Sequence, residues 1–157
     1  MAENSEMRVA VQGMTLADLA EALSGRRPPW EIPIRHVSID SRVCGEGDVF
    51  IALPGERTDG HRYVGDAFQR GAIAALVHQE VSEGAMRVDL ERGPWPESLE
   101  LPVCFRVSRT LEALHRWAGW WRARFPVRVI GVTGSVGKTS TKELIWAVLS
   151  RRYETLK

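Results

Sequence analysis

Apolar residues along this chain of 157 residues follow two patterns, short continuous runs and runs spaced at the period of a helix. Continuous apolar runs of about four to eight residues, bounded by turn residues, are typical of buried strands. The first pattern predicts strands over residues 49–53, 72–77, 103–107 and 127–133, and the alternation of residues 37–40 predicts one more short strand. The second predicts helices over residues 16–24, 62–70, 108–125 and 138–150. Strands that alternate with helices predict an α/β fold, and the polar stretch 78–102 receives no element.

Local signals set the ends of two of these helices. Thr15 is expected to cap the first helix, with Asp18 placed to reach back to it, and Gly25 is a natural stop. Ser108 is expected to cap the long helix that Pro126 ends. Residues at helical spacing predict the apolar face of this long helix: Leu111, Leu114, Ala118, Trp121 and Phe125.

Composition narrows the class of protein. The chain is 44% hydrophobic and 26% charged, which is typical of a soluble globular protein. Its net charge of +1 gives no reason to expect nucleic acid or an acidic membrane surface as a partner. No apolar run approaches the ~20 residues of a membrane span, and residues 1–7 lack a signal-peptide core, so we expect a cytoplasmic protein. Cys44 and Cys104 lack metal-ligand spacing and are expected to be reduced and structural.

The stretch VIGVTGSVGKTSTKE, residues 129–143, carries the clearest chemical signal. An apolar strand leads into a glycine-rich turn, a lysine, two hydroxyl residues and a helix, which is the order that a phosphate-binding loop needs. Lys138 would reach the β- and γ-phosphates of a nucleotide, and the Thr139 hydroxyl would coordinate magnesium. The expected nucleotide-binding residues are Gly134, Ser135, Val136, Gly137, Lys138, Thr139 and Ser140.

This loop departs from the full consensus in one place. The pattern G-x-x-x-x-G-K-[ST] requires glycine at position 132, where this chain has Val132. The alternative interpretation is a plain glycine turn between a strand and a helix, with an exposed lysine.

A second polar group follows the predicted strands at 37–40 and 49–53. In α/β folds ligands lie where strands end and loops open. Hydroxyl, guanidinium and imidazole groups suited to phosphate, uracil or sugar oxygens come from Ser41, Arg42, Arg57, Thr58 and His61. Ordinary turn chemistry is the alternative explanation for these residues. A structural or solvated role is expected for the other histidines, His36, His78 and His115.

Together these two groups resemble the Mur ligase family of bacterial cell-wall synthesis. Similarity to the UDP-binding N-terminal domain of that family lies in residues 40–42, 47–55, 59–61 and 71–72, and similarity to the start of its ATP-binding domain in residues 133–139. The resemblance implies a UDP-binding α/β domain over residues 1–107, a connecting helix over 108–126 and, over 127–157, the first strand, P-loop and helix of a truncated parallel-sheet ATP-binding domain. Contacts to the uridine diphosphate part of a substrate would come from Ile39, Ser41, Arg42, Glu56, Arg57, Thr58, Asp59, Gly60 and His61.

The resemblance also implies a reaction that uses ATP and Mg²⁺. The terminal carboxylate of a UDP-N-acetylmuramoyl tripeptide would be phosphorylated, and the amine of D-alanyl-D-alanine would then attack the acyl phosphate. The expected catalytic residues are Lys138, which would stabilise charge on the phosphoryl group, and Thr139, which would bind the metal. The loop form T-G-S-x-G-K-T resembles the branch of the family that adds D-alanyl-D-alanine, whereas the sister branch, which adds meso-diaminopimelate or lysine, more often has T-G-T-N-G-K-T.

Ligases of this family continue into a complete central domain and a C-terminal domain. We therefore expect an N-terminal fragment, inactive alone, of a ligase that is monomeric when complete. A non-catalytic UDP-sugar-binding module is an alternative. An unrelated P-loop NTPase, such as a small kinase or GTPase, would need an acidic Walker-B strand after the loop, for which these residues leave no room.

Overall fold

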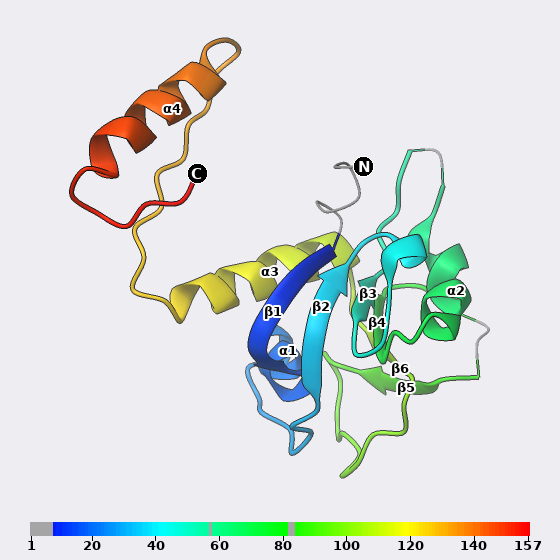
Figure 1. The fold of residues 1–157 in the computed structure, drawn as a ribbon. Coiled ribbons are helices and arrows are strands. Elements are labelled where there is room, and N and C mark those ends of the chain that lie inside the picture. The colour runs from blue at the N-terminus through cyan, green and yellow to red at the C-terminus, as the bar shows by residue number, and fades with distance from the viewer. Residues whose placement is uncertain (1–7, 57, 82–83) are drawn as a thin grey trace. The chain divides into compact units, whose positions relative to one another are not determined.

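A computed structural model describes residues 8–56, 58–81 and 84–157. It divides into two compact units, residues 1–124 and residues 125–157. The first unit holds a six-stranded sheet in the order β1-β2-β3-β4-β6-β5 (Figure 1). β1 is antiparallel to β2, and all the other neighbouring strands are parallel. The predicted α/β class, with a parallel sheet, is confirmed.

The elements follow the predicted order with two additions. The strands are β1 Arg8–Thr15, β2 Pro33–Ser38, β3 Val49–Ile51, β4 Ala74–Val77, β5 Met86–Asp89 and β6 Val103–Arg106. The helices are α1 Leu16–Ser24, α2 Val64–Gln69, α3 Thr110–Ala123 and α4 Lys138–Leu149. Short 3-10 turns lie at Ser41–Val43 and Gly60–Tyr63. Among the described residues, none of the helices has the length and apolar character needed to cross a membrane.

The two additional strands, β1 and β5, lie at the edges of the sheet. Met14 is the buried residue of β1 and Val88 that of β5, so neither strand shows a continuous apolar run. β1 is held by pairing with β2 and by bonds from Arg8 to Asp48. Such long-range pairing leaves no local signal in the sequence.

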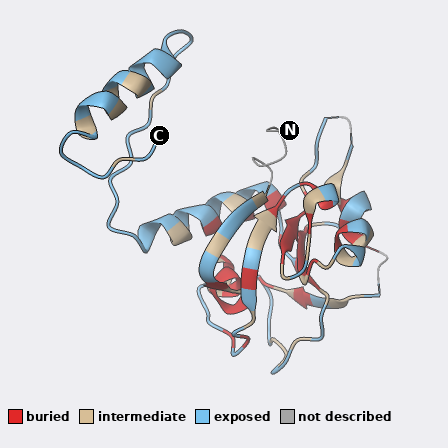
Figure 2. Ribbon diagram, in the orientation of Figure 1, coloured by how far each residue is buried: buried red, intermediate tan, exposed pale blue. Residues whose placement is uncertain are grey.

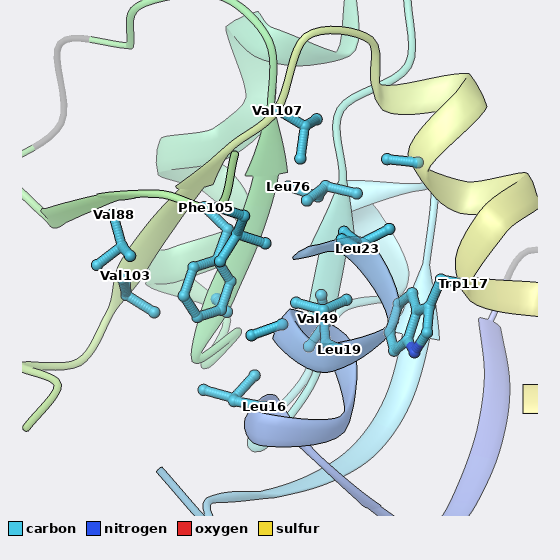
Figure 3. Close-up of a cluster of buried hydrophobic side chains, with 14 of the residues drawn as sticks. Leu16, Leu19, Leu23, Val49, Leu76, Val88, Val103, Phe105, Val107 and Trp117 are labelled. Atoms are coloured by element: carbon cyan, nitrogen blue, oxygen red, sulfur yellow. The ribbon is translucent and has the colours of Figure 1, made fainter. Parts of the chain in front are cut away.

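The central strands β3, β4 and β6 are buried on both faces. Because side chains alternate along a strand, each strand contributes to two separate cores. Toward α1 and α3 lie Val49, Ile51, Ala74, Leu76, Val103 and Phe105, where they meet Leu16, Leu19, Leu23 and Trp117 (Figure 3). Toward α2 lie Phe50, Ala75, Val77 and Cys104, which pack with Val64, Ala67 and Cys44. Both cysteines are buried and free, as expected for structural thiols, and burial raises the pKa of Cys44 to about 11.

Helix α1 begins and ends where the sequence predicts. The Thr15 hydroxyl accepts a hydrogen bond from the Asp18 N–H at 3.2 Å, and the Asp18 carboxylate accepts one from the Thr15 N–H at 2.9 Å. Gly25 ends the helix with φ of 75°, and its N–H donates to the Glu21 carbonyl at 2.8 Å. Residues without Cβ adopt this left-handed conformation at little cost.

Helix α3 differs from its prediction in both its cap and its buried face. Arg109 occupies the capping position without a side-chain bond, whereas the Ser108 N–H and hydroxyl donate to the Glu91 carboxylate. The buried residues are Thr110, Ala113 and Trp117, while the predicted face residue Leu111 is 48% exposed. The predicted stripe therefore missed Trp117 and lies about one position from the most buried face, although its members Leu114 and Trp121 are partly buried against the same core.

Helix α3 shares the core of α1. Its residues Ala113 and Trp117 belong to the same core as α1, and the first compact unit extends to Arg124. Helix α3, at Thr110–Ala123, therefore packs within the first compact unit.

The second unit forms its predicted helix but not its predicted strand. α4 occupies Lys138–Leu149, yet residues 127–133 are not in a strand. A helix satisfies its backbone hydrogen bonds internally, whereas a strand needs a neighbour. Within the described part of this unit no segment pairs with residues 127–133, and Val129 and Ile130 are exposed. Figure 2 shows the contrast, with buried residues gathered in the sheet and α1 and none in α4.

Candidate functional site

The residues predicted to bind the uridine diphosphate part of a substrate lie in loops at the carboxyl ends of β2 and β3. The loop after β3 is a compact turn in which the Gly55 N–H donates to the Thr58 carbonyl at 3.0 Å. Pro54 and Asp59 form an isolated bridge across it. The Gly60 N–H closes the loop on the Leu53 carbonyl at 2.9 Å. A Cβ at position 60 would lie 2.9 Å from the Leu53 backbone, so this approach requires glycine.

Arg42 presents its guanidinium group from the turn after β2. Its Nε and Nη2 donate to the Asp40 carboxylate at 2.9 and 2.6 Å, and Asp40 also caps the turn by accepting from the Arg42 N–H at 3.0 Å. These bonds hold the pKa of Asp40 below its ordinary value. The Arg42 side chain is nevertheless 78% exposed. A guanidinium group has five N–H donors, so donors remain for an anionic or carbonyl oxygen.

A tyrosine that the sequence analysis did not single out completes this exposed surface. The Tyr63 hydroxyl lies 3.0 Å from the Thr58 hydroxyl, and both residues are exposed. Asp40 first, and Tyr63 to a smaller extent, raise the pKa of Arg42. Ile39 and Glu56 are also exposed. We call Ile39, Arg42, Glu56, Thr58 and Tyr63 the carboxyl-edge patch.

Other predicted contact residues point into the protein instead. Ser41 and His61 are buried. The Asp59 carboxylate accepts from the His61 N–H at 3.0 Å, from the His61 Nδ1 at 2.6 Å and from the Gln79 amide at 2.8 Å. These bonds, the backbone one foremost, lower the pKa of Asp59 to about 2. Arg57 lies outside the described residues.

The glycine-rich loop of the second unit has the backbone that phosphate binding requires. Gly134 and Gly137 have φ of 146° and 80°, and Gly137 is the capping residue from which α4 starts. The first N–H groups of a helix have no partner within it and attract anions. The Lys138 ammonium group donates to the Gly134 carbonyl at 2.5 Å, which holds it over the loop. Ser135, Val136, Thr139 and Ser140 are all exposed.

These residues fit the phosphates of a nucleotide and one oxygen ligand of a magnesium ion. The Thr139 hydroxyl is the candidate ligand, because hydroxyl oxygen suits this ion. In the described ranges no group of three or more His, Cys, Asp or Glu side chains is arranged to hold a metal. A metal here would therefore depend on the nucleotide and on Thr139.

Comparison with known proteins gives matches to both units. The model described as "Mur ligase family, catalytic domain" matches residues 33–117. The chain is 43% identical over 121 residues to a UDP-N-acetylmuramoyl-tripeptide–D-alanyl-D-alanine ligase of Synechocystis sp., a match that covers 77% of this chain and 24% of that protein.

Two solved structures share the fold. MurF from Acinetobacter baumannii superposes with a TM-score of 0.69 at 28% identity and covers 92% of this chain and 29% of that one. MurF ligase from Thermotoga maritima, solved in complex with ADP, superposes with a TM-score of 0.59 at 29% identity and covers 77% of this chain and 24% of that one. The chain spans between a quarter and three tenths of the length of these proteins.

Proposed function

Since this chain belongs to the Mur ligase family, we propose that it serves peptidoglycan precursor synthesis as part of an ATP-dependent amide ligase. The ligase adds D-alanyl-D-alanine to UDP-N-acetylmuramoyl-tripeptide. The observation that carries the proposal is the similarity to such ligases across both units, over 92% of the chain in the Acinetobacter structure. Because the chain spans less than a third of those proteins, the reaction is proposed for a ligase of their length.

In this proposal the first unit binds the uridine diphosphate end of the substrate on the carboxyl-edge patch. Arg42 donates to phosphate or uracil oxygens, and Thr58 and Glu56 supply polar atoms from the facing turn. Ile39 offers apolar surface beside them. Arg57 is proposed as a further contact from the same turn. Ser41, Asp59, Gly60 and His61 shape the two loops.

The second unit binds the nucleotide in the same proposal. Bound ATP, with Mg²⁺, supplies the phosphoryl group that activates the terminal carboxylate of the tripeptide as an acyl phosphate. Backbone N–H groups at the start of α4 and in the loop 134–137 hold the phosphates. The Lys138 ammonium group offsets negative charge on the transferring group, and the Thr139 hydroxyl provides a metal ligand.

Calorimetric titration of the 157-residue protein with UDP-N-acetylmuramoyl-tripeptide tests the first unit. Saturable binding is expected, and Arg42→Ala should weaken it about tenfold, the effect of one charge-assisted hydrogen bond. Arg35→Ala is the matched control, because Arg35 lies on β2, before the turn that carries Arg42, and pairs with Glu46 at 3.7 Å in solvent. Absence of binding to the folded protein, or equal losses in both variants, would remove the uridine assignment.

Titration with ADP and Mg²⁺ tests the second unit separately. Lys138→Ala should abolish nucleotide binding, whereas Lys142→Ala, on the same helix but beyond the loop, should leave it unchanged. Nucleotide binding that is insensitive to Lys138→Ala would contradict the P-loop assignment. In the longer ligase, preference for meso-diaminopimelate over D-alanyl-D-alanine as the added group would indicate the sister reaction.

A further inference from the structure

The two ring nitrogens of His61 have different and fixed tasks. Its Nε2 accepts a hydrogen bond from the backbone N–H of His78 at 3.0 Å, and because that group can only donate, Nε2 carries no proton. Its Nδ1 lies 2.6 Å from the Asp59 carboxylate and therefore donates. The ring is buried, and both of its nitrogens already have hydrogen-bond partners within the protein, so it has no polar atom left for a ligand.

His78 and Gln79, the two residues after β4, hydrogen-bond the far end of the loop that follows β3. His78 also reaches the near end of this loop through Thr110. At the far end of the loop, the His78 N–H binds His61 and the Gln79 amide binds Asp59. At the near end, the Thr110 hydroxyl donates to the Ala52 carbonyl at 2.8 Å. The His78 Nδ1 lies 3.0 Å from that same hydroxyl, and since the hydroxyl proton is already used, the ring donates to it.

These hydrogen bonds form a continuous network at the base of the exposed turn. Thr110 is buried at the start of α3, and the rings of His61 and His78 meet edge to face at 4.3 Å. The turn that carries Glu56 and Thr58 is thereby held at both ends. Its near end is bound to α3, and its far end is bound to the residues that follow β4. Holding a loop in its binding conformation lowers the entropy lost when a ligand binds.

We propose that Asp59 and His61, together with Gln79, are positioning residues that hold the turn bearing Gly55, Glu56 and Thr58 against the end of β4, and that they do not contact the substrate themselves. This inference rests on the proposed uridine-binding function of the same turn. His61, expected from the sequence to contact the substrate, is proposed instead to hold the loop. The exposed residues of the turn contact the substrate, and the bonds to His78 and Gln79 keep the turn in place.

Substrate affinity and amide hydrogen exchange of the 157-residue protein test this proposal. His61→Ala should weaken binding of UDP-N-acetylmuramoyl-tripeptide by about tenfold or more, and Gln79→Ala by about fivefold, the effect of one hydrogen bond. His61→Gln offers an amide oxygen where Nε2 accepts, and His61→Asn an amide N–H where Nδ1 donates, so each should recover part of the affinity. His115→Ala, an exposed histidine on α3, is the control and should bind as the wild type does.

Hydrogen exchange separates a loosened turn from general unfolding. The Gly55 and Gly60 amides, which close the turn on Thr58 and Leu53, should exchange faster in His61→Ala and Gln79→Ala, while the α1 amides keep their protection. Gln79 is exposed, so Gln79→Ala preserves the fold if His61→Ala does not.

The outcomes distinguish this inference from the function on which it rests. If the wild type binds the substrate and both variants bind equally well with unchanged exchange, the positioning role is wrong and the function stands. If the wild type does not bind, the proposed function fails, and exchange at Gly55 and Gly60 still decides whether these residues hold the turn.

Discussion

The two compact units of this chain come from similar sequence patterns and differ in how far their residues are buried. In the first unit β3, β4 and β6 are buried on both faces between α1 and α3 on one side and α2 on the other. In the second unit an apolar run and a helix of similar length leave α4 with no buried residue. Local backbone geometry, such as the glycine loop and the helix, forms in both units. Strand pairing and a hydrophobic core form in the first unit, where neighbouring strands and helices supply partners.

The difference shows which functional features depend on packing. The carboxyl-edge patch exists because the neighbouring parallel strands β2 and β3 bring their carboxyl ends together. The phosphate loop needs two glycines and the start of one helix, so it keeps its form in a unit without a core. We therefore expect substitutions in the first unit to change stability and binding together, and substitutions in the second to change binding alone.

A pair of identical substitutions makes the largest difference. Leu19 on α1 is fully buried, and Leu144 on α4 is 68% exposed. Leu19→Ala should lower the free energy of unfolding by about 3 kcal/mol, through lost burial and the cavity left behind. Leu144→Ala should change it by less than about 0.5 kcal/mol. Urea denaturation followed by tryptophan fluorescence measures both, and equal effects would overturn the contrast between the units.

Ion pairs give a second, smaller contrast. Asp48 is fully buried and accepts from Arg8 at 2.8 Å, from His36 at 3.0 Å and from the Gly45 N–H at 2.9 Å. Asp48→Ala should lower the free energy of unfolding by about 2 kcal/mol, less than the ~3–5 kcal/mol typical of a broken buried pair, because the Arg8 side chain can still reach water. In the second unit, Glu143→Ala breaks an exposed pair with Lys157 and should leave the denaturation midpoint unchanged. A shift for Glu143→Ala as large as that for Asp48→Ala would contradict this assignment.

The smallest expected effect is on titration and its salt dependence. The pKa of Asp59 is about 2, chiefly through the His61 N–H bond, and Lys157 lowers the pKa of Glu143. Raising salt from about 0.1 M to about 1 M should return Glu143 to its ordinary range, because exposed charges are screened. Asp59 should keep its low pKa, since its donors, the His61 N–H, the buried His61 ring and the Gln79 amide, carry no charge that salt could screen. Carboxyl-carbon NMR titration measures both groups.

The low pKa of Asp59 also fixes the sign of a pH effect on stability. A carboxyl group with a depressed folded pKa stabilises the protein above its unfolded pKa, near 4, and loses that contribution as the pH falls toward about 2. After allowance for solvent screening, the free energy of unfolding of the wild type should exceed that of Asp59→Asn by about 1 kcal/mol at about pH 5. This difference should shrink at about pH 2, and a difference that stays constant would show that the Asp59 charge contributes nothing.

Elements whose signals lie within a few residues were predictable from sequence. The α1 cap at Thr15, the stop at Gly25 and the loop before Lys138 all depend on neighbouring residues. β1 and β5 were missed because their partners lie far along the chain, and residues 127–133 were predicted as a strand because an apolar run does not say whether a neighbour is present. In the site, the exposure of Arg42 agrees with a binding role. The inward bonds of His61 and the presence of Tyr63 in the patch depend on the folded arrangement of β4 and the turn.

The contact between α1 and the end of α3 has a consequence for dissecting the protein. Asp18, almost fully buried, accepts hydrogen bonds from Arg27 at 2.9 Å and from Arg124 at 3.0 Å, and the Arg124 guanidinium lies 4.7 Å from the ring centre of Trp120. Expression boundaries should respect this contact. A shortened gene that ends after Arg124 keeps both guanidinium partners of Asp18 and the cover over the Trp120 ring. One that ends a few codons earlier leaves Asp18 with Arg27 as its guanidinium partner and uncovers that ring, which should favour aggregation during production.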